Sequence, residues 1–225
     1  MNVTRRAVLA GLALPGVAPA AKPAGLVTFP AEDGVPVTGR IYGRGPRGVV
    51  LIPGGHGVGE TWHMQGERLA RAGFHVLAMD YRGRGLASNV APDDEKAHLD
   101  VIGAGRDLRA RGARSIALVG ASWGGWAAGT AAVGAPGLAD RIALLAHSPF
   151  DHPERLGGRK LFILGREDRV GSGKLRLDEI RQQYDRAPAP KQLVLLDGAA
   201  HAQFLFLTDQ GPRLSREILR FLSAA

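Results

Sequence analysis

Short apolar runs alternate with longer helical patterns along nearly the whole chain after residue 24. Six of these runs are almost continuously apolar, which is typical of parallel strands that are buried on both faces. They are residues 48–53, 74–80, 115–120, 141–147, 160–165 and 192–197. Two β-rich segments before them, residues 25–29 and 37–42, flank the turn-rich sequence PAEDGVP and predict a hairpin. The alternation therefore predicts an α/β fold with a doubly wound, mostly parallel eight-stranded sheet and right-handed crossovers.

Helical patterns fill most of the gaps between the predicted strands. They cover residues 60–72, a segment from PDDEK to Gly112, a stretch that follows Ser122, residues 172–187 and residues 212–222. No internal repeat, low-complexity tract or linker interrupts this pattern, and 225 residues with 45% hydrophobic content suffice for one full core. We therefore expect residues 21–225 to form a single domain.

The first 20 residues differ from the rest of the chain. Paired arginines at Arg5 and Arg6 precede a short apolar stretch and an A-x-A pattern formed by Ala18 and Ala20. This order predicts residues 1–20 to be a signal peptide, and T-R-R-x-V-L resembles the twin-arginine export signal. A loose N-terminal tail is the alternative. The apolar stretch is too short to span a bilayer, so we expect a periplasmic or secreted protein without a stable membrane anchor, or a cytoplasmic one if the signal is not used.

Composition removes several function classes. The chain has no cysteine, which excludes disulfides, thiolate zinc sites and a cysteine nucleophile. The formal net charge is +8, but the basic residues are scattered and are not interleaved with aromatic residues. Diffuse charge of this kind mainly favours solubility, so nucleic acid is not an expected partner.

Two glycine-rich segments imitate nucleotide-binding motifs. Residues 43–48 match G-x-G-x-x-G but lead into a strand instead of a helix, which favours a hairpin turn. Residues 171–174, GSGK, lack both the earlier glycine and the following Ser/Thr of a phosphate loop. His56 and His63 have no third ligand at usable spacing, so we expect no metal and no cofactor.

The sequence GASWGG places Ser122 immediately after the predicted strand 115–120 and before a helix. Glycines at 120 and 124 stand where side chains would collide in a sharp strand-to-helix turn, the context of a nucleophile elbow. A serine hydroxyl needs a base. His201 follows the last strand on a loop of small residues and fits the chain order Ser…Asp…His, while His147, which also ends a strand, is the rival.

A carboxylate must orient the base, and an acyl-transfer site needs donors for the oxyanion. Asp168 is the predicted acid because it follows strand 160–165; Glu167 and Asp151 remain alternatives. The predicted oxyanion donors are the backbone N–H groups of Trp123 and Gly55, and His56 is the alternative to Gly55.

These motifs together resemble the α/β-hydrolase superfamily over nearly all of the chain after the leader. The resemblance rests on GASWGG, PGGHG, MDYRGRG, GREDRV and GAAHAQF. It is nearest to the small, lidless dienelactone-hydrolase-like and esterase branches. Two departures matter: dienelactone hydrolases have a cysteine where this chain has Ser122, and many relatives have a histidine where this chain has Pro53.

The family's lid, when present, usually follows the strand that ends here at His147, and residues 148–159 are too few to form one. We therefore expect an open site lined by His56, His147 and Trp123, with Trp62 and Trp126 in the helix core and Asp80 and Arg82 as structural ion-pair residues. The resemblance implies a serine hydrolase that cleaves carboxylic esters, borne on small molecules or polymers, through an acyl-enzyme. A peptide or amide hydrolase and a non-catalytic binding module are the alternatives. We expect a monomer or weak homodimer.

Overall fold

The computed structural model of the chain describes residues 25–55, 57–85 and 90–224. The predicted signal peptide and His56 lie outside these ranges. Within them, no helix is both long enough and apolar enough to cross a membrane.

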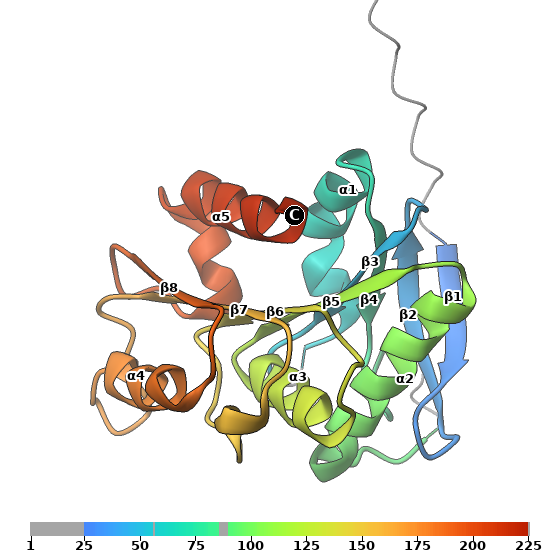
Figure 1. The fold of residues 1–225 in the computed structure, drawn as a ribbon, viewed down its shortest axis with the longest axis horizontal. Coiled ribbons are helices and arrows are strands. Elements are labelled where there is room, and N and C mark those ends of the chain that lie inside the picture. The colour runs from blue at the N-terminus through green and yellow to red at the C-terminus, as the bar shows by residue number, and fades with distance from the viewer. Residues whose placement is uncertain (1–24, 56, 86–89, 225) are drawn as a thin grey trace, which may run out of the picture.

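One eight-stranded sheet, in the order β1-β2-β4-β3-β5-β6-β7-β8, forms the centre of the molecule (Figure 1). The first two strands, β1 (Gly25–Pro30) and β2 (Pro36–Tyr42), form the predicted antiparallel hairpin, and β2 also pairs antiparallel with β4. The other strand pairs are parallel. The remaining strands are β3 (Arg47–Ile52), β4 (His75–Met79), β5 (Ser115–Ala121), β6 (Arg141–Leu145), β7 (Arg159–Gly165) and β8 (Lys191–Leu196). The predicted fold class is confirmed.

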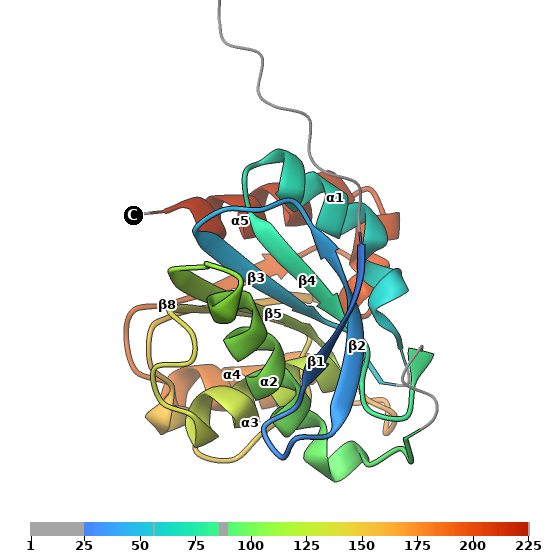
Figure 2. The ribbon, with the colours of Figure 1, turned by 90° about the vertical axis from the view of Figure 1, so that its right-hand side faces the viewer.

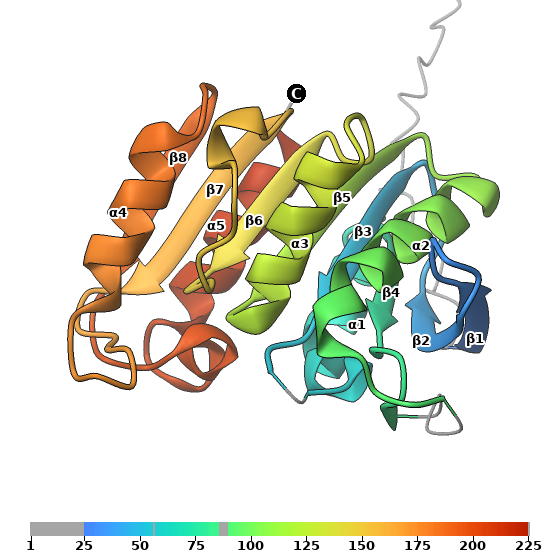
Figure 3. The ribbon, with the colours of Figure 1, turned by 90° about the horizontal axis from the view of Figure 1, so that it is seen from below.

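Helices cover both faces of the sheet. Figures 1 and 2 show α1 (His63–Arg71) and α5 (Gly211–Ser223) on one face, and α2 (Ala97–Ala110), α3 (Trp123–Gly134) and α4 (Arg176–Arg186) on the other. The sheet is therefore buried on both sides, which explains why the central strands are apolar without alternation. Figure 3, which views the molecule from below, shows α2, α3 and α4 in front of the sheet, and the sheet twists from β1 to β8 behind them.

The connection at residues 43–48 is not the predicted hairpin turn. It joins β2 to β3, but β4 lies between these two strands in the sheet. Gly43, with φ +62°, packs so closely that an added Cβ would lie 2.6 Å from the Phe74 carbonyl oxygen. The segment is thus a tight crossover, since β2 is bonded to β4 in antiparallel register and β3 must start on the far side of β4.

One predicted helix start was also wrong. The helix expected from residue 172 begins at Arg176, because Val170 N–H donates to the Lys174 carbonyl (2.9 Å) and closes a turn around Gly173 (φ +82°). The helix expected from residue 60 starts with a 3₁₀ turn, η1 (Gly59–Trp62), before α1 begins.

The predicted structural role of Asp80 and Arg82 takes a different form for each residue. Arg82 forms ion pairs of 2.8 Å with Asp33 and with fully buried Asp100. Asp80 instead accepts hydrogen bonds from the Gly59 amide (2.8 Å) and the Thr38 hydroxyl (2.6 Å). The Asp80 bond to Gly59 fixes η1 against the end of β4, at the carboxyl edge of the parallel strands.

Candidate active site

The chain turns sharply between β5 and α3 at Ser122, which has the strained dihedrals φ 52° and ψ −117°. Its amide donates to the Leu145 carbonyl of the neighbouring strand (2.8 Å), so the turn is tied to the sheet. A Cβ added at Gly120 would lie 2.3 Å from the Gly124 carbonyl oxygen, and one added at Gly124 would lie 2.4 Å from the Pro53 carbonyl oxygen. Only glycine fits at these two positions, and the turn presents the Ser122 hydroxyl at the carboxyl edge of the sheet.

His201 connects Ser122 to Asp168. The Ser122 Oγ lies 2.8 Å from His201 Nε2, and His201 Nδ1 lies 2.8 Å from Asp168 Oδ2. An ionised carboxylate only accepts hydrogen bonds, so Nδ1–H donates to Asp168 and Nε2 is left to accept the serine proton. Asp168 is only 1% exposed, and Arg176 Nε lies 3.3 Å from the same Oδ2. The structure thus brings together the three residues that the sequence predicted as a triad.

A cavity of about 580 Å³ opens over Ser122 and His201. Three segments form its walls: the loop after β3, the start of α1 with η1 before it, and the 3₁₀ segment η5 (Ala202–Leu207) that follows His201. Its lining consists of Gly54, Gly55, Gly57, Glu60, Thr61, His63, Met64, Gln65, Ser122, His201, Ala202, Gln203, Phe204, Phe206 and Leu207. The arrangement can expose a bound carbonyl group to the serine hydroxyl.

The two predicted oxyanion donors belong to the loop after β3 and to the residue that follows Ser122. Gly55 lines the cavity with φ +45°, and the Trp123 amide is the first of α3, where helix N–H groups have no intrahelical partner. The Gly54 amide already donates to Gln203 Oε1 (3.3 Å). The Trp123 ring does not line the cavity as predicted, because it stacks on Trp126 with ring centroids 4.2 Å apart.

A family model described as the alpha/beta hydrolase family matches residues 49–213. The chain belongs to this family. The hydrolase is similar in fold to an esterase from Pyrococcus furiosus (TM-score 0.73, 16% identity, 88% of this chain and 90% of that one). An esterase from Exiguobacterium antarcticum (0.71, 14%, 88% and 99%) and a dienelactone hydrolase from Anabaena variabilis (0.69, 20%, 88% and 96%) are similar too. No match to the sequence was found among curated proteins.

His147 does not contact the cavity of this hydrolase, so its predicted substrate-binding role is wrong. Strand β6 ends at Leu145, and the positive φ of Ala146 (44°) turns His147 beneath α3, where it has no exposed surface. A Cβ added at Gly125 would lie 2.3 Å from the His147 Cβ. Burial lowers the pKa of His147 to about 3, which keeps the ring neutral. Its position also removes it as a rival base.

The alternative acids are not in place either. Glu167 and Asp151 are both exposed, whereas the buried Asp168 makes the hydrogen bond to His201. Among the described residues, no cluster of three or more His, Asp or Glu side chains is arranged to hold a metal ion. Between β6 and β7 the only helical segment is the short η4 (Pro153–Arg155), so no lid arises there.

Gln203 is a site residue that the sequence analysis missed. Its Oε1 accepts from the Gly54 amide (3.3 Å), while its Nε2 donates to the Thr61 carbonyl (3.3 Å) and hydroxyl (3.2 Å). One side chain thereby ties the loop after His201 to the loop after β3 and to η1. Its only sequence signal is its position two residues after the histidine.

Proposed function

We propose that this hydrolase cleaves carboxylic esters through an acyl-enzyme, with Ser122 as nucleophile, His201 as general base and acid, and Asp168 as the orienting carboxylate. The observation that carries this proposal is the unbroken hydrogen-bond chain from Asp168 to Ser122, with 2.8 Å at both contacts, at the floor of an open cavity. A hydroxyl held on an elbow and bonded to an oriented imidazole is the arrangement that activates serine for attack on a carbonyl.

The proposed reaction proceeds in two halves. As Ser122 Oγ bonds to the ester carbonyl carbon, His201 Nε2 takes the hydroxyl proton, and the N–H groups of Gly55 and Trp123 stabilise the oxyanion. The tetrahedral intermediate expels the alcohol, which receives the proton from His201. Water then attacks the acyl-enzyme while His201 takes a proton from the water. The second tetrahedral intermediate collapses, returns that proton to Ser122 Oγ and releases the acid.

The open cavity favours esters over peptides. A peptidase of this kind would need an added domain or lid to select substrates by size, and the described residues form a single sheet domain. The buried Asp168 stabilises the imidazolium that forms in each half-reaction, and Arg176, whose Nε lies 3.3 Å from Asp168 Oδ2, holds that carboxylate in place.

The test is initial-rate hydrolysis of p-nitrophenyl esters from acetate to decanoate by the wild type, Ser122→Ala and the control Ser172→Ala. Ser172 is exposed in the turn before α4 and does not line the cavity. We expect Ser122→Ala to fall to the background rate with an unchanged circular dichroism spectrum, and Ser172→Ala to match the wild type. Equal rates in wild type and Ser122→Ala would overturn the proposal, and faster cleavage of matched p-nitroanilides would favour an amidase.

We also propose that residues 1–20 direct export and that the mature protein is a monomer or weak homodimer. The support is the paired Arg5 and Arg6 ahead of a short apolar stretch. Fractionation of bacteria that express the full chain should place the wild type in the periplasm and Arg5→Lys/Arg6→Lys in the cytoplasm. Sedimentation of the exported protein tests its oligomeric state.

A further inference from the structure

Exposed apolar side chains gather around the active-site cavity. Among the described residues, four large hydrophobic side chains are exposed: Leu26 (58%), Met64 (74%), Phe204 (66%) and Leu207 (79%). Met64, Phe204 and Leu207 all line the cavity over Ser122, whereas Leu26 lies on the edge strand β1 and does not. We call Met64, Phe204 and Leu207 the apolar rim. Grouped exposure of this kind marks a binding surface, while single exposed residues such as Leu26 are ordinary.

The rim residues lie on two elements of the cavity wall. Met64 stands in the first turn of α1, and Phe204 and Leu207 belong to η5, which starts directly after His201. Because the leaving alcohol takes its proton from His201 Nε2, a substrate bound to Ser122 must pass alongside η5. Any apolar group of several carbons on that substrate would then cover rim side chains that are otherwise in water.

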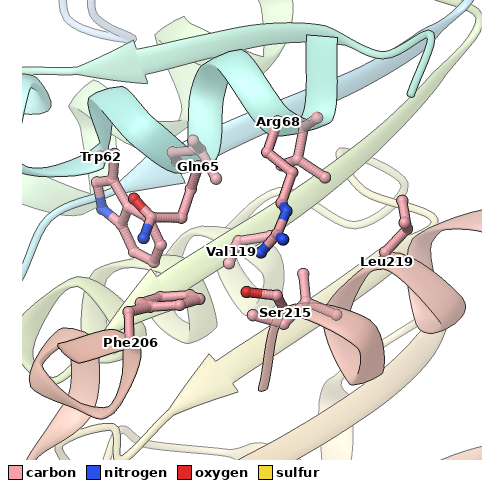
Figure 4. A pocket seen from close by; sticks show the side chains of 10 residues that line it. Trp62, Gln65, Arg68, Val119, Phe206, Ser215 and Leu219 are labelled. Carbon is pink, nitrogen blue, oxygen red and sulfur yellow. The ribbon is translucent and has the colours of Figure 1, made fainter. Parts of the chain in front are cut away.

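The space behind the rim is narrow. Figure 4 shows Trp62, Gln65 and Phe206 facing one another between α1 and η5, and the Trp62 and Phe206 rings meet edge to face at 5.9 Å. Beyond them lies a cavity of about 20 Å³, which shares Gln65 and Phe206 with the active-site cavity. That space holds little more than one water molecule. An apolar group is therefore accommodated along the rim and not in a deeper tunnel.

The charge of the cavity lining also favours a neutral, apolar substrate. Its described residues include no lysine or arginine, and the one carboxylate, Glu60, lies 3.4 Å from Arg40. Of the two histidines among the described lining residues, His63 lies 3.5 Å from Glu67 and His201 lies 2.8 Å from Asp168. An anionic substrate would find no positively charged side chain among the described residues of this lining. A neutral apolar substrate needs no such partner, so its binding carries no penalty for an unpaired charge.

We propose that the apolar rim binds the hydrocarbon part of the substrate, so that this enzyme acts on neutral esters that carry an apolar group of several carbons. This inference rests on the proposed ester hydrolysis at Ser122. Either the acyl group or the alcohol group can supply the hydrocarbon. Each methylene that becomes buried against the rim raises kcat/KM by about two- to fourfold, the larger value applying to complete burial.

The experiment compares two substrate series, p-nitrophenyl esters of acids from acetate to octanoate and acetates of alcohols from ethanol to octanol, all below their critical micelle concentrations. The variants are Phe204→Ser and Leu207→Ser, with Leu26→Ser as the matched exposed control. In one series we expect the wild-type kcat/KM to rise with chain length. We expect each rim variant to lower the long-to-short ratio about tenfold, and Leu26→Ser to leave it unchanged. The series that responds identifies the acyl or the alcohol group.

Two results overturn the inference while leaving the proposed ester hydrolysis intact. The first is Ser122-dependent activity whose chain-length ratios are the same in the rim variants and the wild type. The second is long-chain activity that appears only above the critical micelle concentration, which indicates docking on a lipid surface. A binding measurement that needs no turnover tests the inference even if the proposed ester hydrolysis fails. Calorimetric titration of Ser122→Ala with octyl acetate and p-nitrophenyl octanoate should give binding to at least one ester that Phe204→Ser weakens about tenfold. Binding that is absent or insensitive to Phe204→Ser overturns the inference even if no ester is hydrolysed.

Discussion

Replacement of Gln203 by alanine should slow catalysis without unfolding the protein. The side chain accepts from the Gly54 amide at 3.3 Å and donates twice to Thr61, so it joins the histidine loop to the segment that offers the Gly55 amide. Gln203 touches no reacting atom in this arrangement. In the proposed mechanism it would act by holding Gly55 where the oxyanion forms, which would make it a positioning residue.

The size of the effect follows from one hydrogen bond. A hydrogen bond between neutral groups contributes about 0.5–1.5 kcal/mol net. If the contact with Gly54 holds the loop in its competent position, its loss reduces the competent population, and with it kcat, by about 2- to 12-fold, since 1.4 kcal/mol corresponds to a factor of ten. KM should change less, because the oxyanion contact strengthens only in the transition state.

The assay is steady-state hydrolysis of p-nitrophenyl acetate, with thermal melts of the same samples. The matched control is Gln182→Ala, since Gln182 is an exposed glutamine on α4 that does not line the cavity. Affinity for a boronic acid, which mimics the tetrahedral intermediate, should fall in Gln203→Ala by the same factor as kcat/KM. An unchanged kcat, or a loss confined to KM, would refute the positioning role.

Three further predictions concern the triad and the packing beneath it. Asp168→Asn should lower kcat about 10⁴-fold with an unchanged fold, because the amide no longer fixes the His201 tautomer; steady-state kinetics would contradict this if the loss were below tenfold. Gly125→Ala should cost about 1–3 kcal/mol of stability, since its Cβ would lie 2.3 Å from the His147 Cβ. A denaturant titration with an unshifted midpoint would contradict this, because it would mean that α3 and His147 move apart at no cost. His147 has a folded-state pKa of about 3, below its unfolded value of about 6.5. The unfolded chain therefore binds more protons between these pKa values, and the free energy of unfolding should fall with decreasing pH by up to about 1.4 kcal/mol per pH unit. His147→Leu should remove this slope in pH-dependent melts. An identical slope in both proteins would contradict the burial argument.

Local pattern was enough for the parts of this protein that depend on near neighbours in the chain. The apolar runs predicted six of the eight strands, and the β-rich segments on either side of PAEDGVP predicted the hairpin of β1 and β2. The glycines around Ser122 predicted the elbow because they act within one turn. The chain order of Ser122, Asp168 and His201 also pointed to three side chains that do lie in hydrogen-bonding contact.

Tertiary structure decided what depends on which segments become neighbours. The hydrophobic pattern does not encode the placement of β4 between β2 and β3, because any of these strands could pair without changing it. The positive φ of Ala146 buries His147 instead of aiming it at the cavity, and the link from Gln203 to Gly54 spans 149 residues of sequence. Hydrogen bonds across such separations form only after the loops have been brought together by the packed sheet, so their partners cannot be read from either segment alone.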